Sequence, residues 1–295
     1  MDPKPGKRLL ITGASGFLGW NLLNIACHQW DCYGLYHRNQ LSHSQAAMQK
    51  VDITDYLAIK NIVNTINPDA IIHCAAIANA GFCQKNPEQS RRVNVAAAIN
   101  IADLCNDLNI PCVFCSTDLV FDGLNPPYTE DSPVSPVSIY GEQKVEAEED
   151  MKRRCGSVII CRLPLMFGRA SPVSGCFLQN MLKDFEAGKT LTLFKDEFRT
   201  PAEAKVVAAG LLLALAKEPG IINLGGSERI SRCDFGYLVR EIFSLSKGGI
   251  KPCLQKDVKS PYSRAKDVSL DISKARSLGY KPQSLRFELK TMQSA

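Results

Sequence analysis

The chain lacks any apolar stretch long enough to cross a lipid bilayer. A membrane-spanning helix needs about 20 consecutive, predominantly apolar residues. The longest apolar block, residues 206–216, is shorter and is typical of a buried helix. Residues 1–8 lead directly into the first predicted strand and carry no secretory signal. These absences argue against a membrane partner and favour a cytoplasmic protein.

Runs of basic residues are also missing. The 295 residues carry 35 Lys and Arg against 30 Asp and Glu, a formal net charge of +5, and the charges are scattered. Nucleic-acid binding is therefore not indicated, because it calls for a concentrated basic patch or stripe. A mildly basic balance is enough for a small anionic ligand. The sequence has no internal repeat, low-complexity segment or disordered linker.

A metal site is not indicated either, although the chain contains 12 cysteines. Cys112 and Cys115 have C-x-x-C spacing, but they fall in a predicted buried strand and no second C-x-x-C completes a zinc site. The cysteines are spread through apolar segments, where a reduced thiol packs as a small hydrophobic group. His73 ends a predicted strand, which fits a structural residue or the rim of a cofactor site.

The chain does contain a regular alternation of strands and helices, which predicts an α/β fold with a parallel sheet covered on both faces. The predicted strands are residues 8–12, 32–36, a short one ending at 51–52, 70–75, 112–116 and 158–163. The predicted helices include residues 55–67, 87–109 and 138–154.

After about Phe167 the alternation loosens. It predicts helices at residues 176–187, 204–217 and 234–245, a short strand at 221–224, and a polar helical tail over 271–280 and 284–292. We expect a first domain over residues 1–168 and a smaller C-terminal α/β lobe over residues 169–295, within which the chain can return to the main sheet. Ligands of open α/β sheets bind at the carboxyl ends of the strands, so the lobe is expected to cap that edge.

Three glycines with the spacing G-x-x-G-x-x-G separate the first strand from an apolar-periodic helix. Gly13 lets the chain turn sharply, Gly16 lets backbone N–H groups approach a pyrophosphate, and Gly19 lets the helix pack close to the sheet. The N-terminus of the helix then presents unpaired N–H groups to the phosphates. This strand–turn–helix context predicts a nucleotide site.

A second signal is the pair Tyr140 and Lys144, whose i, i+4 spacing puts both side chains on one helix face. A nearby ammonium favours phenolate and lowers the pKa of a tyrosine from about 10, which would fit Tyr140 for proton transfer. Thr117 lies at the end of the fifth strand, so its hydroxyl reaches the same edge and can hydrogen-bond a substrate carbonyl. Ser116 is the weaker candidate, because alternation points it away from Thr117.

Taken in order, these motifs resemble the extended short-chain dehydrogenase/reductases. The resemblance rests on the glycine turn, Asp52, His73-Cys74-Ala75-Ala76, Asn94, Ser116-Thr117-Asp118-Leu119-Val120-Phe121-Asp122-Gly123, and Tyr140 with Lys144. It covers residues 8–168 and continues more loosely to the end. Within that superfamily, the S-T-D-x-V-F-D-G stretch and the acidic run at 127–131 are similar to the dTDP-4-dehydrorhamnose reductases.

The resemblance implies a Rossmann-type doubly wound sheet that binds NAD(P)(H) at the glycine turn. Tyr140 would be the catalytic acid/base, Lys144 would hold the nicotinamide ribose and tune Tyr140, and Thr117 would orient the substrate oxygen. Asn94 would support the active-site helix, and Asp52 with Ile53 would flank the adenine. The implied cofactor-binding residues are Gly13, Ser15, Gly16, Phe17, Leu18, Gly19, His37, Arg38, Asp52, Ile53, Ala75, Ala76, Asn94, Tyr140 and Lys144.

The end of the second predicted strand favours NADP(H) over NAD(H). NAD sites place a carboxylate there for the ribose hydroxyls, whereas NADP sites need positive charge for the 2′-phosphate. This strand ends in Tyr36-His37-Arg38-Asn39, with no acid, and Arg38 suits a phosphate.

Two departures from the resemblance concern the substrate. Leu119 stands where the dehydrorhamnose reductases usually carry a tyrosine and where sugar-nucleotide 4,6-dehydratases carry a glutamate, which argues against dehydratase chemistry. Lys205 falls where family members often have an aspartate. Both departures weaken the sugar-nucleotide assignment and leave the redox chemistry intact.

The main hypothesis is an NADP(H)-dependent reductase that transfers a hydride to the ketone of a polar or nucleotide-linked small molecule, with Tyr140 as proton donor. One alternative is an NAD-dependent sugar-nucleotide 4-epimerase. Another is a non-catalytic NADP-binding subunit similar to the regulatory β subunit of methionine adenosyltransferase. Many relatives pair through two long helices, here residues 87–109 and 138–154, so a homodimer is expected by analogy.

Overall fold

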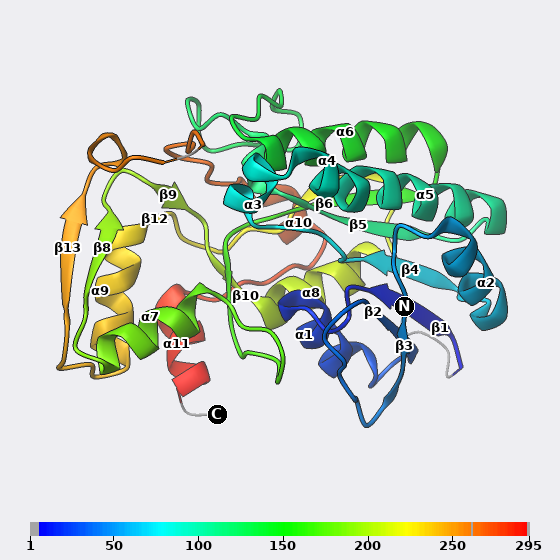
Figure 1. Ribbon diagram of the computed structural model, residues 1–295, viewed down its shortest axis with the longest axis horizontal. Helices are drawn as coiled ribbons and strands as arrows, with labels where there is room; N and C mark the ends of the chain where they lie inside the picture. Colours follow the sequence, from blue (N-terminus) through cyan, green and yellow to red (C-terminus); the bar gives the residue numbers. More distant parts are fainter. Residues whose placement is uncertain (1–5, 261, 294–295) are drawn as a thin grey trace.

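The computed structural model describes residues 6–260 and 262–293, so the expectation for residues 1–5 lies outside the described part. Its centre is a sheet of seven parallel strands in the order β11-β6-β5-β4-β1-β2-β3 (Figure 1). The strands are β1 (Arg8–Thr12), β2 (Asp31–Tyr36), β3 (Ala46–Lys50), β4 (Ala70–His73), β5 (Cys112–Thr117), β6 (Val158–Leu163) and β11 (Gly220–Asn223).

Strand β1 illustrates why both faces of this sheet are covered. Leu9 and Ile11 pack in one apolar cluster, whereas Leu10 between them packs in a second cluster on the opposite face. Strands buried on both faces are nearly continuously apolar, as this one is. The predicted α/β fold with a doubly wound parallel sheet is confirmed.

Two helical layers cover the sheet. On one face, α1 (Phe17–Ala26) packs against α8 (Ala204–Ala214), and α10 (Ser273–Ser277) lies beside β11. On the other face lie α2 (Tyr56–Ile66), α5 (Ala97–Leu108) and α6 (Ile139–Arg154). The short helices α3 (Ala80–Lys85) and α4 (Pro87–Arg91) precede α5.

A third apolar cluster holds the C-terminal lobe together, at the left of Figure 1. It is formed by α7 (Phe177–Glu186), α9 (Arg232–Ile242) and α11 (Leu285–Gln293), packed beside the parallel pair β8 (Thr190–Phe194) and β13 (Gly249–Cys253). Two smaller pairs are β7 (Met166–Phe167) with β10 (Ala202–Glu203), and β9 (Phe198–Arg199) with β12 (Ile230–Ser231). Because β11 is a strand of the main sheet and α8 packs on that sheet, the chain returns to it after residue 168; the boundary itself stays a prediction.

Two predicted elements differ from the structure for local reasons. The helix expected over residues 87–109 contains a turn of π-helix over Arg92–Ala96, between α4 and α5. π turns within helices are frequent at functional sites. Strand β4 ends at His73, two residues before the predicted end, because the Ala75 N–H donates to Thr12 Oγ1 rather than to a neighbouring strand.

The lobe differs more from the sequence prediction. Its tail is not wholly polar, since α11 buries Leu285, Glu288 and Leu289. The paired strands β8 and β13, the short strands β7, β9, β10 and β12, and helix α3 were not predicted. Most of these elements are too short to show a periodic pattern.

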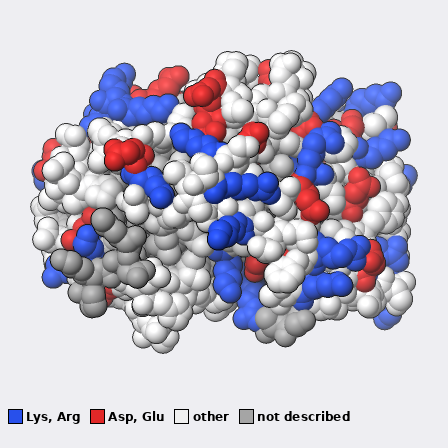
Figure 2. All heavy atoms as spheres, turned by 180° about the vertical axis from the view of Figure 1, so that it is seen from behind, with Lys and Arg blue, Asp and Glu red and all other residues white. Residues whose placement is uncertain are grey.

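Charges of both signs are interspersed over the face drawn in Figure 2, as their scatter in the sequence suggests. Within residues 6–260 and 262–293, no helix is long and apolar enough to span a bilayer. The same residues hold no group of three or more His, Cys, Asp or Glu side chains suited to a metal ion.

Candidate functional site

The glycine turn leaves the start of α1 open to a ligand. Gly13 has a φ of +67°, and a Cβ there would lie 2.8 Å from the backbone of Ala75. A Cβ on Gly19 would lie 2.3 Å from the Gly13 carbonyl oxygen. Gly16 caps α1 without a side chain, so the first N–H groups of the helix have no side-chain partner at the cap. These unpaired donors favour an anion.

A cleft of about 620 Å³ opens beside this turn. It is lined by the ends of β1, β2, β3 and β4 and by residues around the π turn. The predicted cofactor residues that line it are Gly13, Ser15, Gly16, His37, Arg38, Asp52, Ile53, Ala75 and Ala76. The lining does not include the predicted residues Phe17, Leu18, Gly19, Asn94, Tyr140 and Lys144.

The charged side chains of the cleft are mostly basic. Arg38 and Arg92 are exposed on its wall, and His37 Nε2 lies 3.8 Å from Asp52 Oδ2. Thr54 donates to Asp52 Oδ1 from its backbone N–H at 2.9 Å and from its hydroxyl at 2.7 Å. These two bonds are the main reason why the pKa of Asp52 is lowered.

Thr117, Tyr140 and Lys144 are brought together and buried where β5 meets α6. The Lys144 ammonium donates to the Cys115 carbonyl oxygen at 2.7 Å and lies 4.2 Å from the centroid of the Phe114 ring. Burial lowers the pKa of Lys144 to about 8.

The protonation of Tyr140 corrects one expectation from the sequence. Burial and the nearby Asp118 carboxylate raise the pKa of Tyr140, and the neighbouring Thr117 hydroxyl opposes this only in part. The expected lowering by Lys144 does not prevail. The phenol therefore stays protonated at neutral pH, a state that suits a proton donor.

Thr117 and Ser116 point to opposite sides of β5, as strand alternation predicts. The Thr117 hydroxyl donates to Asp118 Oδ1 at 3.2 Å and accepts from the Leu119 N–H at 3.2 Å. Ser116 instead donates to the Glu148 carboxylate.

Glu148 belongs to a buried ion pair that fixes α6 to the sheet. Arg162 on β6 donates to both oxygens of Glu148, at 3.2 and 2.9 Å, and both side chains are almost fully buried. Glu148 follows Tyr140 and Lys144 at the same four-residue spacing, so all three side chains share one face of α6. The pair therefore helps to determine how the face of α6 that carries Tyr140 and Lys144 lies on β5 and β6.

Asn94 connects the cleft to the same helix. Its amide group bonds both the N–H and the carbonyl oxygen of Ile77, at 2.8 and 3.1 Å, and donates to Gln143 Oε1 on α6 at 2.9 Å. Asn94 is buried within the π turn at Arg92–Ala96. Asn94 thus lies behind the cleft wall and contacts α6, in the geometry that a supporting residue needs.

His73 is buried rather than placed at the rim of the cleft. Its Nδ1 lies 2.7 Å from Thr12 Oγ1, which in turn accepts from the Ala75 N–H. Burial lowers the pKa of His73 to about 3, so the ring is neutral. These contacts help to hold the end of β1 against the end of β4 and the residues that follow it.

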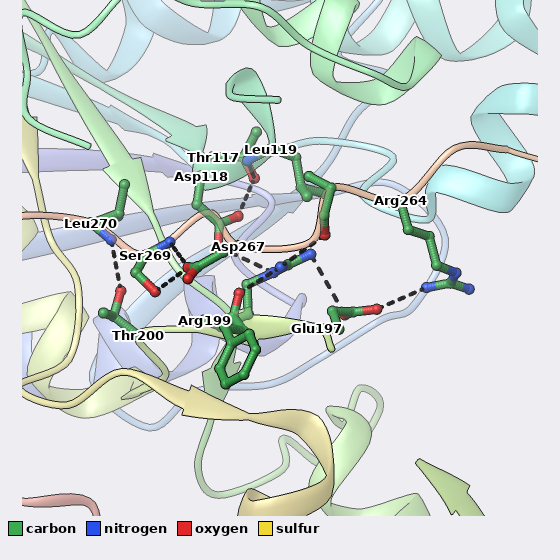
Figure 3. Close-up of polar contacts among 12 residues, drawn as sticks. Thr117, Asp118, Leu119, Glu197, Arg199, Thr200, Arg264, Asp267, Ser269 and Leu270 are labelled. Carbon is green, nitrogen blue, oxygen red and sulfur yellow. Dashed lines mark hydrogen bonds and ion pairs between the residues drawn. The ribbon is translucent and has the colours of Figure 1, made fainter. Parts of the chain in front are cut away.

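Charged side chains of the lobe meet Asp118 at the end of β5 (Figure 3), and none of those labelled there lines the cleft. Arg199 Nε lies 3.7 Å from Asp118 Oδ2, Arg199 Nη2 lies 3.5 Å from Glu197 Oε1, and Glu197 Oε2 lies 3.7 Å from Arg264 Nη1. Arg232 stacks on the Phe177 ring, and its Nη1 is buried without a hydrogen-bond partner among the described residues. Side chains of the lobe thus form a charge network of both signs, with three arginines and one glutamate, beside Asp118 at the carboxyl end of β5.

A sequence profile of the RmlD substrate binding domain family matches residues 7–295. The chain belongs to this family. The resemblance to extended short-chain dehydrogenase/reductases similar to dTDP-4-dehydrorhamnose reductases is thereby confirmed.

Several known proteins are similar to this family member over most of its length. A probable low-salt glycan biosynthesis reductase, Agl14, of Haloferax volcanii is 29% identical over 97% of each chain. Methionine adenosyltransferase 2 subunit beta of Rattus norvegicus is 25% identical over 93% of this chain and 83% of that protein. The crystal structure of dTDP-4-dehydrorhamnose reductase from Bacillus anthracis in complex with NADP matches with a TM-score of 0.87 and 21% identity, covering 97% of this chain and 98% of that one. This structural likeness confirms the Rossmann-type fold.

The sequence analysis missed residues on both sides of the site. In the cleft these include Thr54, Phe82, Gln89 and Arg92. Arg92 lies two residues before the predicted Asn94 and begins the π turn. On the lobe side the arginines had no spacing signal. Lys205, singled out as a departure, is exposed in the first turn of α8.

Proposed function

We propose that the protein is an NADP(H)-dependent reductase that transfers a hydride to a ketone of a nucleotide-linked sugar. The observation that carries the proposal is the burial of Thr117, Tyr140 and Lys144 together at the end of β5, beside a cleft built on the glycine turn. A nicotinamide cofactor bound in the cleft would supply the hydride. The chain's own residues would bind the cofactor and the substrate and would protonate the substrate oxygen.

The cleft fits a dinucleotide by its shape and its donors. The first turn of α1 offers unpaired N–H groups and contains no acidic residue. The nearest atom to a Cβ built on Gly16 is the Gly13 carbonyl oxygen at 3.1 Å, so the space beyond Gly16 belongs to the cleft. Arg38 and Arg92 supply positive charge beside the end of β2. This charge supports NADP(H) over NAD(H).

The catalytic roles follow from hydrogen-bonding capacity. Tyr140, protonated at neutral pH, would deliver its proton to the substrate oxygen as negative charge develops there. Lys144 uses one N–H for the Cys115 carbonyl oxygen and keeps two N–H donors for a ribose hydroxyl. Thr117 would contact the same substrate oxygen and orient it.

The three arginines of the lobe beside Asp118 support an anionic substrate. Arg232 and Arg264 lie close to Arg199, while Glu197 is the acid that they share. A buried guanidinium N–H without a partner is costly, and a phosphate oxygen would satisfy it. The names of the relatives point the same way, since they include a glycan biosynthesis reductase and a dTDP-4-dehydrorhamnose reductase.

The experiment is a screen of nucleotide-linked ketosugars, followed by NADPH absorbance. Tyr140→Phe should reduce turnover by about 10²–10⁴-fold and leave NADPH affinity unchanged, because only the transferred proton is removed. Lys144→Ala should reduce both turnover and affinity. Tyr237→Phe, on an exposed part of α9, is the matched control and should change neither. Near-normal turnover by Tyr140→Phe would contradict the assignment.

A non-catalytic binding subunit is the second candidate, favoured by the similarity to methionine adenosyltransferase 2 subunit beta. It predicts tight NADPH binding without turnover of any ketone. A 4-epimerase would interconvert two sugars without net consumption of NADPH. NADPH absorbance therefore separates a reductase from both alternatives, and chromatography of the sugars after incubation separates an epimerase from a binding subunit.

The cytoplasmic location and the homodimer stay proposals. The face expected to pair carries ion pairs within the chain, Arg91 with Glu146 and Arg154 with Asp103. Light scattering would measure the oligomeric state directly.

A further inference from the structure

The strongest unexplained feature lies between Thr117 and the lobe (Figure 3). Asp118 is 3% exposed, and its two oxygens have different surroundings. Oδ1 accepts the Thr117 hydroxyl, whereas Oδ2 is buried with no hydrogen-bond donor among the described residues. The group facing Oδ2 is the Arg199 guanidinium, whose Nε lies 3.7 Å away.

The lobe holds Arg199 in place. Its Nη1 donates to the carbonyl oxygens of Phe198 at 2.7 Å and Ala265 at 3.4 Å, and its Nη2 pairs with Glu197. Arg199 is therefore anchored to two lobe segments while its charge reaches the end of β5. The ionisation of Asp118 depends on a residue of the other structural unit.

The Thr117 hydroxyl has a single hydrogen and two lone pairs. The Leu119 N–H occupies one lone pair. When Asp118 is ionised, its Oδ1 takes the hydrogen, and the free lone pair makes Thr117 an acceptor toward the site. When Asp118 is protonated, the carboxyl group can donate to Thr117, which frees the Thr117 hydrogen for Tyr140 or a substrate oxygen.

This difference distinguishes the two sides of the proposed reaction. A ketone oxygen only accepts hydrogen bonds, whereas the alcohol that forms from it also donates one. Resting on the proposed function, we propose that Asp118 and Arg199 are positioning residues that set the direction of the Thr117 hydroxyl. With a neutral Asp118 carboxyl, Thr117 can donate its hydrogen to the ketone oxygen. With an ionised carboxylate held by Arg199, Thr117 can accept the hydrogen of the alcohol.

The electrostatics allow both states near neutral pH. Burial raises the pKa of Asp118 to about 6, and Glu197 adds to this, while Arg199 and the Thr117 hydrogen bond act in the opposite direction. Tyr140 faces Asp118 from α6, but its raised pKa places its own titration far higher. A change in activity near pH 6 is thus separable from one caused by Tyr140.

The test is the pH profile of kcat/KM for ketone reduction at saturating NADPH. In the unmodified protein kcat/KM should fall about tenfold as pH rises through the pKa of Asp118. A tenfold change corresponds to the loss of about one net hydrogen bond. Arg199→Met should move this fall to higher pH by roughly one to three pH units, because a nearby cation favours the carboxylate. Arg199→Lys should restore the original profile, and Asp118→Asn should remove the fall.

Arg229→Met is the control, since Arg229 pairs with Asp267 at 2.6 Å, is half exposed and makes no contact with Asp118. A second measurement does not depend on turnover: carboxyl-carbon NMR titration of protein labelled with ¹³C-aspartate, in which Asp118→Asn identifies the resonance. A titration of Asp118 that Arg199→Met leaves unchanged, or a fall that persists in Asp118→Asn, would overturn this inference alone. Absence of ketone reduction in the unmodified protein would overturn the proposed function.

Discussion

The two sides of the candidate site are built in different ways. The cleft beside the glycine turn is lined by short segments that follow β1, β2, β3 and β4, together with residues of α3, α4 and the π turn, all within the first 93 residues. The charged side beyond Thr117 joins Asp118 to Glu197, Arg199 and Arg264, which come from the distant C-terminal lobe. Local sequence pattern thus determines the cleft, whereas tertiary assembly determines the charged side.

The cleft side can be broken without unfolding the protein. Gly16 has an extended backbone, with φ of −71°, and a Cβ there meets only the Gly13 carbonyl oxygen at 3.1 Å. We expect Gly16→Val to abolish detectable NADPH binding in calorimetry, because its side chain would occupy the space of the pyrophosphate. The melting temperature should change little.

Gly19→Val is the contrasting variant. Its Cβ would lie 2.3 Å from a backbone oxygen, so it should lower the melting temperature sharply. Unchanged NADPH affinity in folded Gly16→Val would remove the nucleotide site from this turn.

A buried ion pair between distant segments should instead affect the stability of the fold when one partner is removed. Arg162→Met would leave Glu148 buried without its cation, and we expect a loss of about 3–5 kcal/mol in the free energy of unfolding. Guanidinium unfolding measures it. The matched control is Arg154→Met, which removes a half-exposed pair with Asp103 and should cost less than about 1 kcal/mol. Equal losses in the two variants would show that the buried pair does not fix α6.

The same contrast explains how much could be predicted from the sequence. The glycine turn, Arg38, Asp52 and the Tyr140–Lys144 spacing follow rules that act within a few residues. The sequence therefore predicted residues that line the cleft and a helix that carries Tyr140 and Lys144, while their catalytic and binding roles stay predictions. Arg199, by contrast, has no local sequence signal, because its role depends on its contact with Asp118, which lies about 80 residues earlier in the chain. The lowered pKa expected for Tyr140 failed for a related reason: burial and a neighbouring carboxylate are properties of the folded chain.

In the lobe, charge assembly also predicts a pH-dependent stability. Glu288 on α11 accepts from the N–H groups of Glu203 and Gln283, at 3.0 and 3.1 Å. Burial, with Glu203 and Glu228 nearby, raises the pKa of Glu288 to about 7. The folded state keeps this proton to higher pH than the unfolded state. The associated stability is present below pH 4.5 and is lost as pH rises through about 7.

We expect unfolding free energy to fall between pH 5 and 8 by on the order of 2 kcal/mol, and Glu288→Gln to flatten that slope. The control is Glu241→Gln. Glu241 is an exposed residue of α9 that pairs with Arg286 of α11, and its replacement should leave the slope unchanged. A slope that persists in Glu288→Gln would assign the effect to another group.

The smallest expected effect returns to the cleft and asks whether local pattern also determines cofactor choice. Arg38 is exposed at the end of β2, and the one acid on that wall, Asp52, is engaged by Thr54 and faces His37. Asp52 is therefore poorly placed to reject a 2′-phosphate, and Arg38 is free to bind it. We expect Arg38→Ala to weaken NADPH binding by roughly 1–2 kcal/mol and to leave NADH binding unchanged.

Lys50→Ala, at the exposed end of β3 outside the cleft lining, is the control in the same calorimetric titrations. Equal affinities of the unmodified protein for NADPH and NADH would contradict the preference, and the arginine would then be a solvated surface residue.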